Sequence, residues 1–159
     1  AKSMKSRIAE ILDTVAGLAS AGYAIGLHVR FAAPTYLFRT YSPEWNEHYS
    51  ASGLVMQDPV VAWGMTETGA VRWSALKDSD PAGVLTDAEE FGLAYGATVG
   101  RLEDGSRTVA GFARPDREFS DLELGQLQSA VAELHELTKE GVRFSSADER
   151  TIRTRSVTA

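Results

Sequence analysis

The segment ATVGRLEDGSRTVAGFA (residues 97–113) decides the fold that we expect for this chain. Two strand-like runs, ATVGRL and RTVAGFA, flank the residues EDGS. An Asp-Gly pair between two such runs is a strong signal for a tight hairpin turn. The segment therefore predicts two antiparallel neighbouring strands, and with them an antiparallel sheet.

Three more strands are expected earlier in the chain. The run YAIGLHVRF (residues 23–31) alternates, with Ile25, Leu27, Val29 and Phe31 on one side, as a strand with one buried face does. Residues 35–40 and 70–74 predict two further strands. The sheet should thus have about five strands.

Helices are expected between these strands. Apolar residues recur at helical spacing in residues 5–22, 41–53, 58–68, 86–96 and 120–139. Gly96 is expected to close the fourth helix, and Ser120 with Glu123 forms a capping box that opens the last one. The apolar seam of the last helix is expected to be core, with a dimer surface as the alternative. The order α-β-β-α-α-β-α-β-β-α predicts an α/β (α+β) fold, an α/β/α sandwich around a central antiparallel sheet.

Composition narrows the classes of function. The chain has 159 residues and no cysteine, which excludes disulfides, thiolate zinc sites and thiol nucleophiles. No apolar run approaches the roughly 20 residues of a membrane span. The net charge of −6 argues against binding to nucleic acid by the chain as a whole. Residues 143–159 are the exception, with a net charge of +2.

Catalysis is not expected from this sequence. The histidines His28, His48 and His135 lack the spacing of metal ligands, and no nucleophile elbow or phosphate-binding loop is present. We expect no metal and no cofactor. His135 should lie at the surface or at its boundary, His48 should lie off the aromatic stripe described next, and His28 could face either a ligand or the core.

One segment combines aromatic residues with a carboxylate. Tyr41, Trp45 and Tyr49 are four residues apart and would form one stripe on a helix, and Asp58 precedes Pro59. The simple interpretation is a core helix followed by an Asp N-cap with Pro at the first helical position. The alternative is a pocket in which Asp58 accepts a hydrogen bond from an amide while the aromatic side chains donate to carbonyl oxygens.

The ordered set Y-x-x-x-W-x-x-x-Y, DPV, Trp73 and EEFGLAYGATV resembles the autoinducer-binding domain of LuxR-type quorum-sensing regulators. The resemblance covers roughly residues 5–140. It implies the α/β/α sandwich predicted above and an N-acyl-homoserine lactone as ligand. It also implies that Gly92, Leu93, Gly96 and Thr98 pack a helix against a strand.

The resemblance implies a role for each polar residue of the set. Asp58 would accept the amide N–H of the ligand, Trp45 would donate to the lactone carbonyl, and Tyr41 would donate to the acyl carbonyl. Three further residues would line the site, namely Tyr49, Val60 and Trp73. On the last strand Phe112 takes the place of a frequent Ser or Thr, with Thr108 on the same face. That contact would then be either missing or supplied by Thr108, and Phe112 would shorten or bend the acyl channel.

The domain organisation follows from the same comparison. Residues 1–142 should form the ligand-binding domain, and residues 143–159 should be a short basic tail or linker remnant without a helix-turn-helix. The chain is either the sensor part of a longer bacterial, cytoplasmic regulator or a standalone protein that sequesters the signal. The standalone form could also pair with full-length regulators without ligand. A homodimer or heterodimer is expected, with no DNA binding by this chain itself and no membrane partner.

Overall fold

The structure is a computed structural model that describes residues 4–30 and 33–139. Its elements in order are α1 (Met4–Leu18), β1 (Gly22–Arg30), β2 (Ala33–Arg39), α2 (Pro43–Ala51), η1 (Leu54–Gln57), α3 (Pro59–Thr66), β3 (Gly69–Arg72), η2 (Trp73–Ser79), α4 (Val84–Glu90), β4 (Tyr95–Glu103), β5 (Ser106–Arg114) and α5 (Asp121–Leu137). The predicted order is confirmed, with the 3-10 helices η1 and η2 added. The predicted tail at 143–159 and the domain boundary at 142 lie outside the described residues.

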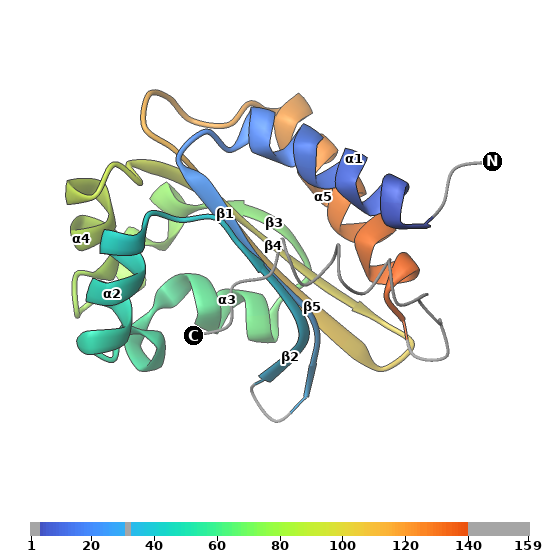
Figure 1. Cartoon of the computed structure of the whole chain (residues 1–159). Helices are drawn as coiled ribbons and strands as arrows, with labels where there is room; N and C mark the ends of the chain where they lie inside the picture. The colour runs from blue at the N-terminus through green and yellow to red at the C-terminus, as the bar shows by residue number, and fades with distance from the viewer. Residues whose placement is uncertain (1–3, 31–32, 140–159) are drawn as a thin grey trace.

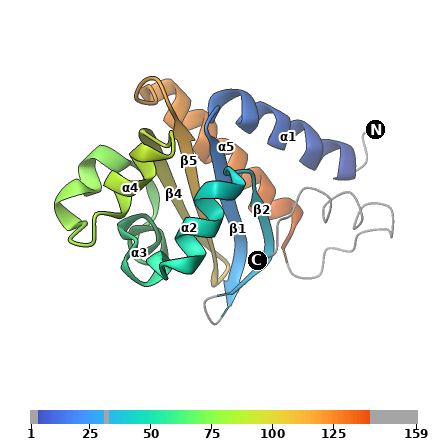
Figure 2. The same ribbon diagram turned by 60° about the vertical axis from the view of Figure 1, so that its left-hand side comes forward.

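The five strands form one sheet in the order β2-β1-β5-β4-β3, and all neighbours are antiparallel. Helices α1 and α5 cover one face of this sheet, and α2, α3 and α4 lie on the other (Figures 1 and 2). The predicted α/β/α sandwich is therefore confirmed. It holds one apolar cluster between the sheet and α1/α5, and a second beneath α2–α4.

The predicted hairpin between β4 and β5 is present. Glu103 pairs with Ser106, and Asp104 and Gly105 between them have φ angles of 53° and 75°. Two successive positive φ values define a type I′ turn, whose twist matches that of the strands it joins. Asp and Gly are among the residues that adopt this conformation at least cost.

The α1/α5 layer confirms two further predictions. Ser120 and Glu123 form both hydrogen bonds of the capping box at the start of α5. The α5 residues Leu127, Val131 and Leu134 are fully buried, so the centre of its apolar seam belongs to the core. They pack with the α1 residues Ile8, Ile11, Leu12 and Val15.

A bulge in β1 changes which residues face which layer. The pairing of β1 with β5 shifts between Gly26 and Val29, and His28 has a φ of 53°. An extra residue in a strand reverses the alternation beyond it. Val29 therefore lines the cavity under α2–α4, and the prediction that it shares the side of Ile25 and Leu27 is wrong.

Several element ends differ from the prediction. Helix α2 begins at Pro43 instead of residue 41, because Ser42 is its N-cap and precedes a proline, which disfavours helical geometry. Helix α4 ends at Glu90, and Gly92 with a φ of 87° follows it, so Gly96 does not close this helix. Gly96 instead lies in β4.

Candidate ligand-binding site

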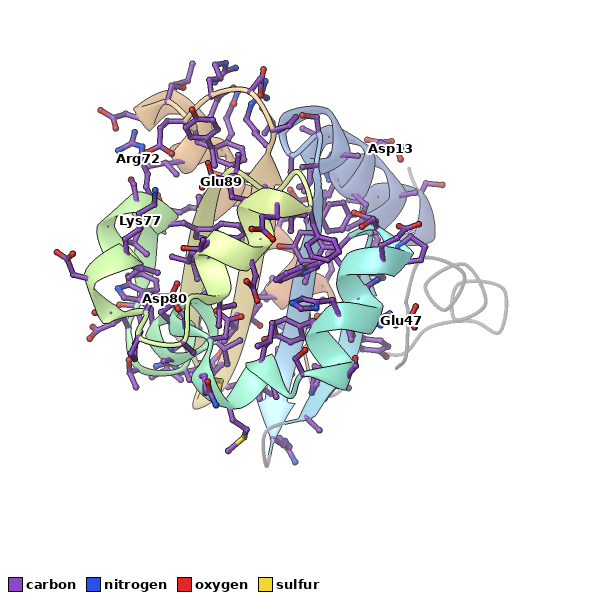
Figure 3. The ribbon with its side chains drawn as sticks, turned by 90° about the vertical axis from the view of Figure 1, so that its left-hand side faces the viewer. Asp13, Glu47, Arg72, Lys77, Asp80 and Glu89 are labelled. Carbon is purple, nitrogen blue, oxygen red and sulfur yellow. The ribbon has the colours of Figure 1, made fainter. Side chains whose placement is uncertain are left out.

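A cavity of about 300 Å³ lies between the sheet and the α2–α4 layer. Its floor has small side chains, with Ala24 and Gly26 on β1 and Gly111 on β5. Figure 3 looks onto the covering layer, where Glu47 of α2 and Glu89 of α4 are exposed. These two carboxylates thus lie on the outer side of the layer, while Trp45 and Trp73 are buried beneath it.

Three of the predicted site residues converge above Gly111. A Cβ atom built on Gly111 would lie 3.2 Å from Tyr41 Oη, 3.6 Å from Val60 Cγ1 and 3.8 Å from Trp73 Cζ2. These side chains come from the segment before α2, from α3 and from η2. The absence of a side chain at Gly111 therefore keeps the floor open where the three meet.

Asp58 has two structural partners within the same cavity. Its Oδ1 accepts from the backbone N–H of Val60 at 2.9 Å, which makes it the N-cap of α3. Its Oδ2 accepts from the Tyr49 hydroxyl at 2.8 Å. Asp58 is thus the N-cap of α3, as the simple interpretation predicted, and its side chain also lines the cavity. A carboxylate offers about four acceptor positions, so two bonds leave capacity for another donor.

Burial controls the charge states in the cavity. The pKa of Asp58 is raised, chiefly by burial, although the hydrogen bonds from Tyr49 and Val60 and the nearby backbone amide of Val61 oppose the rise. The pKa values of Tyr41 and Tyr49 are also raised, first by burial and then by the Asp58 charge. Both phenols therefore keep their protons at neutral pH and remain hydrogen-bond donors.

The aromatic stripe is built differently from the prediction. Tyr41 precedes α2, so only Trp45 and Tyr49 share the helix. The Trp45 ring packs at 5.6 Å from Tyr49 and at 5.4 Å from Phe91, between ring centroids. Tyr41, Trp45 and Tyr49 all line the cavity nonetheless. Among the described residues, neither the Tyr41 hydroxyl nor the Trp45 indole N–H has a hydrogen-bond partner.

Trp73 is held in place from β4. Its indole N–H donates to Thr98 Oγ1 at 3.0 Å. A Cβ atom on Gly96 would lie only 2.0 Å from Trp73 Cδ2, so a glycine is required beneath the ring. Gly96 and Thr98 thus pack against Trp73, which forms one wall of the cavity.

Thr108 and Phe112 do not reach this cavity. Both are fully buried on the opposite face of β5, where Phe112 belongs to the α1/α5 core and Thr108 hydrogen bonds with His135 Nδ1 at 2.7 Å. Because side chains alternate along a strand, the cavity face of β5 carries Val109 and Gly111 instead. The predictions that Thr108 contacts the ligand and that Phe112 shortens the channel rest on the wrong face of the strand.

A family model described as the autoinducer binding domain matches residues 5–137. The chain belongs to this family. The transcriptional activator SolR of Ralstonia solanacearum is 32% identical over 96 residues, which are 60% of this chain and 41% of SolR. The chain thus spans less than half the length of this curated relative.

Solved structures share the fold of this autoinducer-binding domain. Escherichia coli SdiA has a TM-score of 0.63 at 20% identity, over 94% of this chain and 70% of SdiA. SdiA in complex with octanoyl-rac-glycerol has a TM-score of 0.62 at 20% identity, over 94% and 68% of the two chains. The N-acylhomoserine-lactone-dependent LuxR family factor CepR2 of Burkholderia cenocepacia has a TM-score of 0.57 at 19% identity, over 85% and 93%. The family is one of ligand-binding domains of transcription regulators and not a known enzyme family.

The histidines of the autoinducer-binding domain lie outside the cavity. His28 faces α5, where its Nε2 donates to the His135 carbonyl at 2.9 Å and its Nδ1 accepts from the Ser106 hydroxyl at 2.6 Å. His135 is buried, so the prediction of a position at the surface or at its boundary is wrong. His48 lies off the stripe and donates from Nε2 to Asp87 at 3.0 Å.

The sequence did not reveal several cavity residues, of which Arg39 at the end of β2 is the most polar. Strand alternation could have placed Arg39 on the cavity face. Leu37 and Arg39 alternate with the buried Phe38, so they share the face opposite to it. Asn46 also lines the cavity, and its side-chain amide donates to the Tyr41 carbonyl at 3.2 Å.

Within the described ranges, no helix is both long and apolar enough to cross a membrane.

Proposed function

We propose that the cavity binds an N-acyl-homoserine lactone and that the chain is the signal-sensing part of a LuxR-type regulator. The observation that carries the proposal is the enclosed carboxylate of Asp58, which shares an apolar cavity with Tyr41 and Tyr49. Purely apolar guests would leave this carboxylate without a further donor. A guest with an amide N–H would provide one.

The geometry supports a role for each side chain. Asp58 accepts the amide N–H, and the unpartnered Tyr41 hydroxyl donates to the acyl carbonyl. The Trp45 indole N–H, which is also unpartnered, donates to the lactone carbonyl, and Trp73 packs against the lactone ring. Val60 and the small residues of the floor contact the acyl chain, and Tyr49 acts by orienting Asp58.

The solved relatives agree with such a ligand. CepR2 is described as dependent on N-acylhomoserine lactone, and SdiA has been solved with octanoyl-rac-glycerol, a molecule with an acyl chain and a polar head. Each buried methylene would add about 0.8 kcal/mol to binding. A cytoplasmic location and pairing with a second LuxR-type chain remain part of this proposal.

Binding measured by calorimetry and by thermal unfolding tests the proposal. The purified chain should bind at least one lactone from a panel of acyl lengths, and its melting temperature should rise with ligand concentration. The Asp58→Asn variant should lose most of this binding. The matched control is Asp78→Asn, since Asp78 is exposed on η2 and the charge change is the same. A chain that binds no lactone would instead favour the form that pairs with regulators without ligand.

A further inference from the structure

Arg39 is the cavity residue that the roles above leave unused. It is the last residue of the edge strand β2, and its side chain lines the cavity. Its Nε atom is enclosed and has no hydrogen-bond partner. Within residues 4–30 and 33–139, no group pairs with the rest of its guanidinium either.

The unpaired guanidinium of Arg39 differs from the other arginines among the residues that the structure describes. Each of them has at least one interaction partner, a carboxylate in most cases; they are Arg7, Arg30, Arg72, Arg101, Arg107, Arg114 and Arg117. Arg101 also has an enclosed Nε without a partner, but its Nη2 pairs with Glu103. Arg39 as a whole is half-buried, and Nε is the enclosed atom of its side chain. Enclosing an N–H donor without an acceptor is unfavourable, so an enclosed Nε at the edge of a cavity suggests an acceptor carried by the ligand.

The sheet register fixes where that acceptor would lie. Arg39 pairs with Ala24, and Ala24 pairs with Gly111, so the three residues form one row across β2, β1 and β5. Neighbouring strands are about 4.8 Å apart, which places the α carbon of Arg39 roughly 10 Å from that of Gly111. Tyr41, Val60 and Trp73 meet above Gly111, which makes that end of the row the place for the ligand's head group.

The floor between the two ends can hold a chain. Ala24 presents one methyl group, and Gly26 beside it presents none. Leu37, another cavity-lining residue of β2, provides an apolar side wall. A ligand anchored above Gly111 can therefore extend over Ala24 until it reaches the guanidinium.

We propose that Arg39 is a specificity-determining residue, which donates a hydrogen bond to an oxygen acceptor carried by the acyl group of the signal. The inference rests on the proposed function, because it presumes that the head group of a lactone occupies the Gly111 end. The acceptor is a carbonyl or carboxylate oxygen, both of which suit a planar cationic donor. The signal is accordingly not a plain alkanoyl lactone.

Calorimetry with lactones of matched chain length tests this inference. One set carries an unsubstituted alkanoyl chain, a second carries a keto group at successive positions, and a third ends in a carboxylate. The wild-type chain should bind at least one oxygenated lactone about 10-fold or more tightly than its unsubstituted counterpart. A preference for the keto set or for the carboxylate set identifies which acceptor the residue takes.

Two substitutions assign the preference to Arg39. Arg39→Met should abolish it, and without ligand its melting temperature should be equal to or above that of the wild type, since an unpaired buried donor is removed. Arg39→Gln keeps an N–H donor without the charge, so it should retain part of a keto preference and lose a carboxylate preference. The control Arg101→Met changes a half-buried arginine outside the cavity and should keep the wild-type preference.

The outcomes separate this inference from the proposed function. If plain alkanoyl lactones bind the wild type as tightly as every oxygenated one, and Arg39→Met binds them equally, the role of Arg39 is overturned while lactone binding stands. If no lactone of any set binds the wild type, the proposed function itself fails.

Discussion

The Tyr49 hydroxyl donates a 2.8 Å hydrogen bond to Asp58 Oδ2, while Asp58 Oδ1 caps α3 through the Val60 N–H. One carboxylate thus links α2 to α3 and also faces the cavity. The residue that should recognise the ligand is therefore also part of the scaffold, and its two roles need variants that separate them.

Substitutions at Asp58 should separate capping from recognition. Asp58→Ala removes the cap and the bond to Tyr49, and should lower the free energy of unfolding by about 1–3 kcal/mol. Asp58→Asn keeps a capping oxygen and removes a buried charge, so its stability should stay within about 1 kcal/mol of the wild type. Lactone binding should be weakened at least 10-fold in both variants, but residual binding should remain measurable. Urea unfolding and calorimetry measure the two effects, and full binding by Asp58→Asn would show that the carboxylate is only a cap.

The pH dependence of binding should follow Asp58. Its pKa is raised by burial, so this group contributes stability at low pH that is lost as pH rises through its folded pKa. Lactone affinity should change in the opposite sense and fall on acidification, since the charged carboxylate is the stronger acceptor. Tyr49→Phe removes a bond that lowers this pKa, so the fall should begin at a higher pH in that variant. Titration of affinity against pH checks this, and coincident curves for the two proteins would contradict it.

His135 should make the fold sensitive to mild acid. Its pKa is lowered by burial first, then by His28 and Arg101, with Glu103 opposing. A histidine with a lowered folded pKa stabilises the protein above its unfolded pKa of about 6.5, and this contribution is lost as pH falls toward the folded value. The free energy of unfolding should therefore decline as pH falls through about 6.5 toward the folded pKa of His135. His135→Gln should flatten this slope, and an unchanged slope would rule His135 out as its source.

Two glycines should respond differently to the same substitution. Gly96→Ala places a methyl group 2.0 Å from the Trp73 ring and should destabilise the fold by about 1–3 kcal/mol. Gly111→Ala meets its nearest atom, Tyr41 Oη, at 3.2 Å, so its effect on stability should be smaller while lactone affinity falls. Thermal unfolding with and without ligand distinguishes them. Equal losses of stability would mean that the cavity floor at Gly111 is as tightly packed as the Trp73 contact.

Much of the fold could be predicted from local signals. The Asp104-Gly105 turn and the Ser120 capping box each depend on a few adjacent residues, and both are present as expected. The start of α2 could also have been predicted, because Ser42-Pro43 is an N-cap followed by a proline at the first helical position.

The faces of the strands were harder to predict. Thr108 and Phe112 were placed on the cavity side by counting, but a shift of one residue moves every side chain to the other face. In β1 the bulge at His28 reversed Val29 in the same way, and the isolated Gly26, which is a signal for a bulge, was not used in the prediction. Arg39 was missed because its importance depends on a cavity that many separate segments enclose.

The affinity of a lactone whose amide N–H is replaced by an ester oxygen tests the central claim most directly. The wild-type chain should bind the ester at least 10-fold more weakly than the amide, because a hydrogen bond to a charged group contributes roughly 1.5–3 kcal/mol. Asp58→Ala should bind the two compounds equally. If the wild type binds ester and amide with the same affinity, Asp58 does not accept the ligand's amide, and the account of this site is contradicted.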